Sequence, residues 1–237
     1  MIPKGKASAK LKIQVLAGGI SHERDISLKS GRRVADALTD FGASVVIREP
    51  DSKLLSNIKK DAPDVIWPCL HGASGEDGAL RDVLSLTGVP FVGATASAAR
   101  LAWDKSIAKV LVARAGILTP PSITLPKETF RELDAESVLK AVTSSIALPV
   151  VVKPARSGSA QGVTIVHEQS ELNRAMIDAY VYCDVALIEK FIEGTELAVS
   201  VIDLGAGPIA LPAVEIEPVA GHFGYDERYT AGETNYY

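Results

Sequence analysis

Short apolar runs alternate with amphipathic stretches over residues 12–92, and this alternation constrains the fold more than any other feature of the chain. The runs predict strands at 12–17, 43–47, 64–69 and 89–92, and helices at 27–41, 54–60 and 78–86. A strand–helix–strand series forms a parallel sheet, which binds ligands at the carboxyl ends of its strands. Gly18-Gly19 and His71-Gly72 follow two of the predicted strands, so we expect a ligand site there.

A long helix is predicted for residues 97–115, closed by Gly116. Thr119-Pro120-Pro121 follows it. Two consecutive prolines cannot continue a helix and favour an extended backbone. We therefore predict a domain boundary at this point, with one domain in residues 1–119 and a second in residues 120–237.

The second domain is predicted to be α+β, because strand pairs are interleaved with helices. The predicted strands are 122–125, 149–153, 163–166, 185–189, 196–202 and 211–217, and the helices are 127–143 and 168–182. Residues 222–237 are polar, aromatic and poorly periodic, which predicts a loop. Its four tyrosines are compatible with a lid over a site or with a disordered tail.

The segment 149–163 points to nucleotide chemistry. An apolar β-branched run ends at Lys153, and a loop carrying Gly158, Ser159 and Gly162 follows. A lysine amine and several backbone N–H donors would meet where a polyphosphate could lie. A buried strand followed by an ordinary glycine turn is the alternative that this segment alone leaves open.

Composition favours small-molecule ligands over nucleic acid, and it indicates that the cysteines are reduced. The net charge of −4 and the pI near 5.6 lack the basic excess that binding to many phosphates of a nucleic acid requires. Cys69 and Cys183 are too few for a disulfide framework, and Cys69 lies in an apolar run. The basic N-terminus leads only into the short run Val15-Leu16-Ala17, and nowhere do 18 apolar residues follow one another. We expect a cytoplasmic protein with no membrane or export signal.

Two strand-end loops carry candidate ligand groups. Gly18 to Arg24 places Glu23 just beyond a strand, where a carboxylate could hold a substrate ammonium. The alternative is a glutamate that pairs with Arg24 or opens the next helix. His71 to Gly78 combines three glycines, a histidine and two acids, and a capped turn is as plausible there as a ligand contact.

Three further charged positions remain open on local sequence alone. Lys105 lies in the predicted long helix, where a lone lysine is usually solvated. Glu189 ends an apolar strand and Glu196 opens another, so the two carboxylates could reach an adenine amino group and ribose hydroxyls, or could lie in a surface hairpin.

Taken together and in order, these motifs make the chain resemble the D-alanine–D-alanine ligase family of ATP-grasp enzymes. The resemblance covers the chain after its first ten residues. The matching runs are GGISHERDISLKSG (18–31), LHGASGEDGAL (70–80), GVPFVGA (88–94), DKSIAK (104–109), AGILTP (115–120), PVVVKPARSGSAQGV (149–163), IEKFIEGTEL (188–197) and ERYTAGETNYY (227–237).

The resemblance implies a fold and a reaction. Residues 1–119 would form a Rossmann-like preATP-grasp domain with a parallel sheet that binds the first amino acid. Residues 120–237 would form the N-terminal part of an α+β ATP-grasp domain, ending in the lid loop. ATP would phosphorylate one D-alanine, and the amine of a second would attack the acyl phosphate, giving D-alanyl-D-alanine for peptidoglycan. The implied partners are D-alanine, ATP and a second copy in a homodimer, and Mg²⁺ is the implied cofactor.

Site residues carry over position by position. Glu23 would bind the ammonium of the first D-alanine, and His71 would lie near its carboxylate. The remaining positions concern ATP and the lid. Lys105, Lys153 and Arg228 would contact phosphates, Glu189, Lys190 and Ile192 would line the adenine site, Glu196 would hold the ribose, and Ser159 and Tyr229 would complete a hydrogen-bonded link with Glu23.

Three departures from the family pattern qualify these expectations. Ala160 follows Ser159 where the family has a second serine, and Arg228 replaces a lysine before the lid tyrosine. The sequence also stops at Tyr237, before the part in which the family carries its magnesium ligands, so none is assigned here. A non-catalytic or partner-dependent fragment, and a ligase for a different carboxylate and amine, are the alternative functions.

Overall fold

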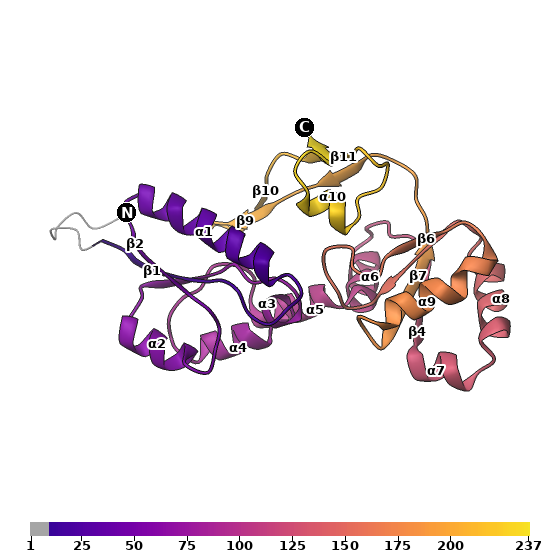
Figure 1. Ribbon diagram of the computed structural model, residues 1–237, viewed down its shortest axis with the longest axis horizontal. Helices are drawn as coiled ribbons and strands as arrows, with labels where there is room; N and C mark the ends of the chain where they lie inside the picture. The colour runs from indigo at the N-terminus through magenta and orange to yellow at the C-terminus, as the bar shows by residue number, and fades with distance from the viewer. Residues whose placement is uncertain (1–9) are drawn as a thin grey trace. The chain divides into compact units, whose positions relative to one another are not determined.

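The computed structural model describes residues 10–237, and the chain divides into two compact units, residues 1–104 and 105–237 (Figure 1). The predicted boundary at Thr119-Pro120-Pro121 falls inside the second unit, after a helix that belongs to it. The basic N-terminal residues 1–9 lie outside the described part of the chain.

The first unit is a three-stranded parallel sheet with helices on both faces (Figure 1). Its strand order is β2-β1-β3. The elements are β1 (Lys12–Leu16), α1 (Arg24–Asp40), β2 (Ser44–Arg48), α2 (Leu54–Asp61), β3 (Val65–Pro68), α3 (Ala73–Glu76), α4 (Ala79–Ser85) and α5 (Ala96–Trp103). The predicted parallel sheet is confirmed, although the strand expected at 89–92 is reduced to a single parallel bridge between Ile66 and Phe91.

Alternating side chains of β1 supply the two cores of this unit. Ile13 and Val15 pack with Ala35 of α1 on one face, and Leu16 packs with Ile58 of α2 and Leu84 of α4 on the other. A strand covered on both faces is mostly apolar, and this explains the apolar residues Ile13, Val15, Leu16 and Ala17. The exception is Gln14, which is fully buried in the same strand.

The second unit is built on a four-stranded antiparallel sheet of order β4-β7-β5-β6. The elements are α6 (Lys105–Arg114), β4 (Ser122–Pro126), α7 (Lys127–Glu132), α8 (Ala135–Ser145), β5 (Val150–Pro154), β6 (Thr164–Val166), the 3₁₀ turn Gln169–Glu171, α9 (Leu172–Tyr180), β7 (Val185–Lys190), β8 (Glu196–Ala198), β9 (Val201–Asp203), β10 (Pro208–Ala210), β11 (Val214–Pro218), α10 (Tyr225–Tyr229) and β12 (Thr234–Tyr236). One sheet face packs on α8 and α9 around Val152, Met176 and Ile188.

Three predicted elements are interrupted in the structure. The helix expected at 97–115 ends at Trp103, because Asp104 has an extended backbone, and a new helix starts at Lys105. The helix expected at 127–143 breaks at Leu133, after which Asp134 caps α8 by accepting a hydrogen bond from the Ser137 amide at 2.9 Å. The strand expected at 196–202 divides into β8 and β9 because the two halves pair with different strands, β11 and β10.

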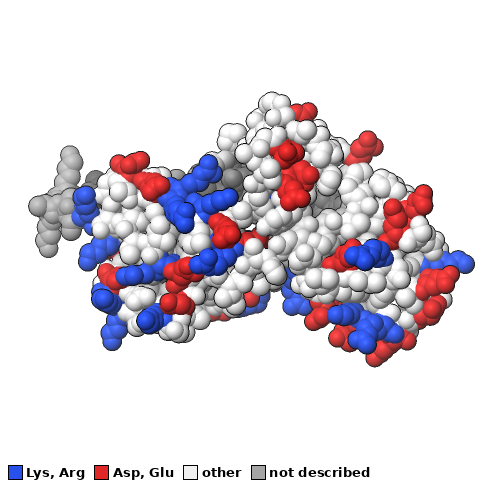
Figure 2. All heavy atoms as spheres, in the orientation of Figure 1, with Lys and Arg blue, Asp and Glu red and all other residues white. Residues whose placement is uncertain are grey.

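The loop prediction for residues 222–237 is wrong in part, since this segment contains α10 and β12. Strand β12 pairs antiparallel with β11, which gives the tyrosine-rich segment a fixed backbone. No helix of residues 10–237 is long and apolar enough to cross a membrane. On the face in Figure 2, positively and negatively charged side chains lie interspersed.

Candidate functional site

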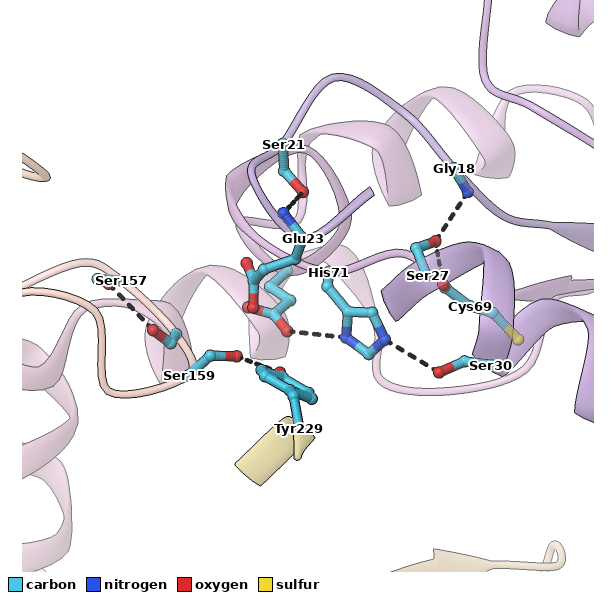
Figure 3. A network of polar contacts seen from close by, with 12 residues as sticks. Gly18, Ser21, Glu23, Ser27, Ser30, Cys69, His71, Ser157, Ser159 and Tyr229 are labelled. Atoms are coloured by element: carbon cyan, nitrogen blue, oxygen red, sulfur yellow. Dashed lines mark hydrogen bonds and ion pairs between the residues drawn. The ribbon is translucent and has the colours of Figure 1, made fainter. Parts of the chain in front are cut away.

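Ser27 joins the carboxyl ends of two parallel strands in the first unit (Figure 3). Its hydroxyl accepts a hydrogen bond from the Gly18 amide at 2.8 Å and donates one to the Cys69 carbonyl at 2.6 Å. These bonds fix the loops after β1 and β3, which carry Glu23 and His71. Sequence reasoning missed Ser27, although it lies in the quoted run 18–31.

Glu23 is buried, with 2% of the residue exposed, at the position just before α1. Its amide donates a hydrogen bond to the Ser21 hydroxyl at 3.2 Å. Gly72 has φ +74, and a Cβ at that position would lie 3.0 Å from Glu23 Oε2 and 2.9 Å from Ser21 Cβ. Only glycine fits both the backbone and the space, so the loop after β3 can lie directly against this carboxylate.

Arg24 pairs with Glu49, at 2.5 Å from Nη2 to Oε1, and not with Glu23. One alternative reading of Glu23, an ion pair with its neighbour, is therefore wrong. The other is right in part, because Glu23 directly precedes α1, but its side chain makes no capping hydrogen bond.

His71 lies between Ser30 of α1 and Glu76 of α3. Figure 3 shows its contact with Ser30. Its Nε2 is 3.3 Å from the Ser30 hydroxyl, and its Nδ1 is 3.9 Å from Glu76 Oε1. The imidazole is thus oriented by groups from two elements, with part of the ring exposed. Such a histidine can present a hydrogen bond or a charge to an anionic ligand.

A lysine–glutamate–lysine cluster occupies the second unit, on the sheet face opposite Val152 and Ile188. Glu189 of β7 accepts from Lys153 of β5 at Oε1 and from Lys109 of α6 at Oε2, the latter at 2.8 Å. Burial by itself would raise the pKa of the Glu189 carboxyl, but the two ammonium groups outweigh it and lower the pKa below its ordinary value. Glu189 is therefore an ionised hydrogen-bond acceptor.

The loop between β5 and β6 adjoins this cluster. Ser159 and Ala160 adopt left-handed conformations, with φ +52 and +57, and Gly162 has φ +68. Lys105, the first residue of α6, is bound to the start of the loop: its amide donates to the Ala155 carbonyl at 2.9 Å and its Nζ to the Ser157 carbonyl at 2.7 Å. Lys105 is therefore not the solvated helix lysine that local sequence favours.

Ser159 and Tyr229 are in contact, as expected: their hydroxyl oxygens lie 2.5 Å apart (Figure 3). Tyr229 lies on α10, with the ring of Tyr225 edge-on at 5.0 Å. Its neighbour Arg228 stacks on Phe223, with the guanidinium carbon 3.9 Å from the ring centroid. The terminal segment thus has a defined structure and reaches the loop after β5, so the disordered-tail alternative is wrong, and the lid over a site stays a prediction.

The side chains of three residues that were predicted to bind nucleotide do not bond to Glu189. Lys190 Nζ donates to the carbonyls of Ala147 and Leu148, at 3.0 and 3.2 Å. Ile192 is 63% exposed, and Glu196 is exposed on β8. Within residues 10–237, no group of three or more His, Cys, Asp or Glu side chains could hold a metal ion.

The comparisons with known proteins agree with this architecture. A protein-family profile described as the D-ala D-ala ligase C-terminus matches residues 111–237. The D-alanine–D-alanine ligase of Bordetella petrii is 35% identical over 99% of this chain and 70% of its own length, and that of Desulforudis audaxviator is 38% identical over 93% and 70%. The chain spans about 70% of the length of these relatives.

Solved structures match over nearly the whole chain. The VanG D-Ala:D-Ser ligase of Enterococcus faecalis superimposes with a TM-score of 0.76 at 27% identity, covering 97% of this chain and 76% of that one. The Bacillus anthracis D-alanine–D-alanine ligase complexed with ATP gives 0.74 at 27% identity, covering 96% and 70%.

The fold and the site together define an ATP-grasp ligase, with a parallel-sheet domain followed by the α+β part of the grasp domain. The chain belongs to the D-alanine–D-alanine ligase family.

Proposed function

We propose that this chain carries out ATP-dependent ligation of two D-alanines to D-alanyl-D-alanine, a precursor of peptidoglycan. The observation that carries the proposal is the arrangement around the loop after β5. Lys105 binds its first half, Tyr229 contacts Ser159 in its second half, and Lys153 and Glu189 adjoin it on the sheet. Family membership and a relative solved with ATP support the same reading.

The proposed reaction has two steps. A carboxylate oxygen of the first D-alanine attacks the γ-phosphorus of ATP, the bond to the β-phosphate oxygen breaks, and ADP leaves. The amine nitrogen of the second D-alanine then attacks the acyl carbon, phosphate leaves with the bonding electrons, and the nitrogen loses a proton. Water must be kept from the acyl phosphate, and a closed lid does this.

Residue roles follow from charge and position. In the first unit, Glu23 supplies a buried carboxylate for the ammonium of the first D-alanine, and His71 supplies a hydrogen bond to its carboxylate. In the second unit, Ser159 and Tyr229 hold the lid. For ATP, we assign Lys105, Lys153 and Arg228 to the phosphates, Glu189, Lys190 and Ile192 to the adenine, and Glu196 to the ribose.

Phosphoryl transfer of this kind ordinarily uses Mg²⁺ to neutralise phosphate charge. We include the ion among the requirements of the proposed reaction. The described residues do not fit a metal centre, so we assign no ligand and derive no step through it.

A second candidate function is ligation with a different amine acceptor. It is favoured by the likeness to a solved D-Ala:D-Ser ligase.

We further propose a cytoplasmic homodimer, for which light scattering after gel filtration should give twice the mass of 25.0 kDa.

Phosphate release with ATP, Mg²⁺ and D-alanine tests the function directly. Parallel reactions replace the second amino acid by D-serine, D-lactate or L-alanine, and mass spectrometry identifies the product. D-alanyl-D-alanine as main product supports the proposal, and a D-alanyl-D-serine product supports the second candidate. ATP binding without any turnover would instead indicate a non-catalytic fragment.

Lys153→Ala tests the assigned ATP site separately. Loss of a charged hydrogen bond to phosphate should weaken ATP binding about 10- to 100-fold. Lys140→Ala removes an exposed lysine of α8 in the same unit and should leave binding unchanged. Equal affinities of the two variants in calorimetry would contradict the assignment.

A further inference from the structure

Lys109 is a fully bonded ammonium inside the second unit. Its Nζ donates to the Thr119 hydroxyl at 2.7 Å, to the Pro120 carbonyl at 2.8 Å and to Glu189 Oε2 at 2.8 Å. Three acceptors use all three donors of a lysine ammonium. Only 13% of its side chain is exposed. None of the roles assigned above uses this residue.

Glu189 is held from two sides by two different elements. Lys109 comes from α6 and takes one carboxylate oxygen, while Lys153 comes from β5 and takes the other. Within residues 10–237, these are the charged groups that act on the Glu189 carboxyl; Ser122, which faces it in register on β4, is neutral. The cluster therefore contains two positive charges and one negative charge.

The same lysine fastens α6 to the sheet. No residue of α6 is buried, and none belongs to the apolar cores of the described residues. Its anchors are polar: Lys105 to the loop after β5, and Lys109, one turn further along the same helix face, to Glu189 and to the segment before β4. Lys109 thus sets the position from which Lys105 reaches the loop.

We propose that Lys109 is a positioning residue for nucleotide binding. It holds Glu189 ionised and in place when the phosphates of ATP draw Lys153 away. It also keeps α6, and with it Lys105, at the loop after β5. The inference rests on the proposed ATP site. With Lys109 present, Glu189 keeps one partner throughout. Without it, Lys153 is the only counter-charge that the described residues 10–237 give this buried carboxylate, and nucleotide must compete with that ion pair for the lysine.

The first measurement is ATP affinity by calorimetry for the parent chain, Lys109→Met, Glu189→Gln and the double variant. Met preserves length and apolar bulk while removing the charge. Lys109→Met should bind ATP roughly 10- to 100-fold more weakly. In the Glu189→Gln background the same change should cost less than about threefold, because no buried carboxylate remains to be compensated.

The second measurement is proton uptake on binding, from calorimetry in two buffers of different ionisation heat. When Lys153 leaves Glu189 in Lys109→Met, the pKa of the carboxyl rises and it takes up a proton. Binding by this variant should therefore involve extra proton uptake relative to the parent and weaken from pH 6 to pH 8. Glu189→Gln/Lys109→Met should lose the extra uptake, which a purely structural lysine would not produce.

Two further variants control for folding. Lys109→Arg keeps a cation at the position and should restore most of the affinity, and Lys140→Met should behave as the parent. Unchanged affinity of Lys109→Met, or equal losses in both backgrounds without extra proton uptake, would overturn this inference alone. A parent chain that fails to bind ATP would overturn the proposed ATP site and this inference with it.

Discussion

Single residues of this chain illustrate how a polar group is satisfied or left unsatisfied by its surroundings. Lys109 and Glu189 are compensated on every side, whereas Gln14 is fully buried in β1 and its amide nitrogen and oxygen have no hydrogen-bond partner among the described residues. It shares a sheet face with Leu16 and Ile66, in an otherwise apolar core. A buried unsatisfied amide opposes folding.

Gln14→Met should therefore stabilise the first unit by about 1–3 kcal/mol, because it removes the desolvation cost and keeps the volume. Both tryptophans of the chain, Trp67 and Trp103, lie in this unit, so their fluorescence in urea reports its unfolding. Gln14→Glu should shift the midpoint the other way. A lower midpoint for Gln14→Met would show that the amide has a stabilising role.

At the scale of elements, the loop after β5 shows how backbone strain and close packing combine. Gly162 has φ +68, and a Cβ there would lie 2.7 Å from Tyr182 Cδ2 and 3.1 Å from Pro154 Cγ. Gly116 has a similar φ of +80, but a Cβ there would meet nothing within 4 Å. The two glycines separate the cost of conformation from the cost of crowding.

Gly116→Ala should destabilise the second unit by about 1–2 kcal/mol through left-handed strain alone. Gly162→Ala should cost a further ~1–3 kcal/mol through overpacking, and it should displace Ser159 from Tyr229. Hydrogen exchange of the β5 and α9 peptides measures both effects. Equal protection in the two variants would contradict the crowding shown by the structure.

The sequence predicts regular elements where pattern and packing agree, and fails where a long-range contact decides. Strand β1 and helix α2 are found within one or two residues of their predicted positions, because the spacing of their apolar residues matches the positions that are buried. The break at Asp104 was not predicted, although aspartate is a favoured residue directly before a helix and was the available local signal. Tertiary contacts of Lys105 and Lys109, which the local sequence does not show, then bind α6 to the rest of the unit.

The candidate site was likewise predicted where the signal is local and missed where a long-range contact decides. Lys153 and the glycine loop could be recognised because a strand followed by that loop is a local pattern. Lys109 could not, although its spacing of four from Lys105 in DKSIAK was the available signal, because its partner Glu189 is 80 residues away. Ser27 was missed for a similar reason, since it bonds to Cys69 across the sheet.

At the scale of the whole molecule, burial is unevenly distributed along the chain. Ile188 is the last residue along the chain that belongs to any of the three apolar cores, and no residue between 191 and 237 is buried. Strands β8 to β10 expose large apolar side chains, including Leu197, Val201 and Ile209. Segments with few buried contacts open at low free-energy cost.

Limited proteolysis with thermolysin should therefore cut first between residues 197 and 214, leaving a resistant fragment that contains both sheets with apolar cores. Cleavage sites are identified by mass spectrometry at early times. ATP should slow cleavage in the α10 region if that segment closes over nucleotide. A first cut within residues 122–190 would contradict the distribution of burial.

The hairpin formed by β9 and β10 turns at Gly205 and Gly207, whose amides both donate to Asp203 Oδ1. Its turn is closed by its own backbone and one aspartate, and its strands contribute nothing to an apolar core. Insertion of a foreign domain between Leu204 and Gly207 should thus leave intact the residues that we propose to bind ligand. This turn is a natural place to graft a fluorescent reporter and convert the chain into a sensor.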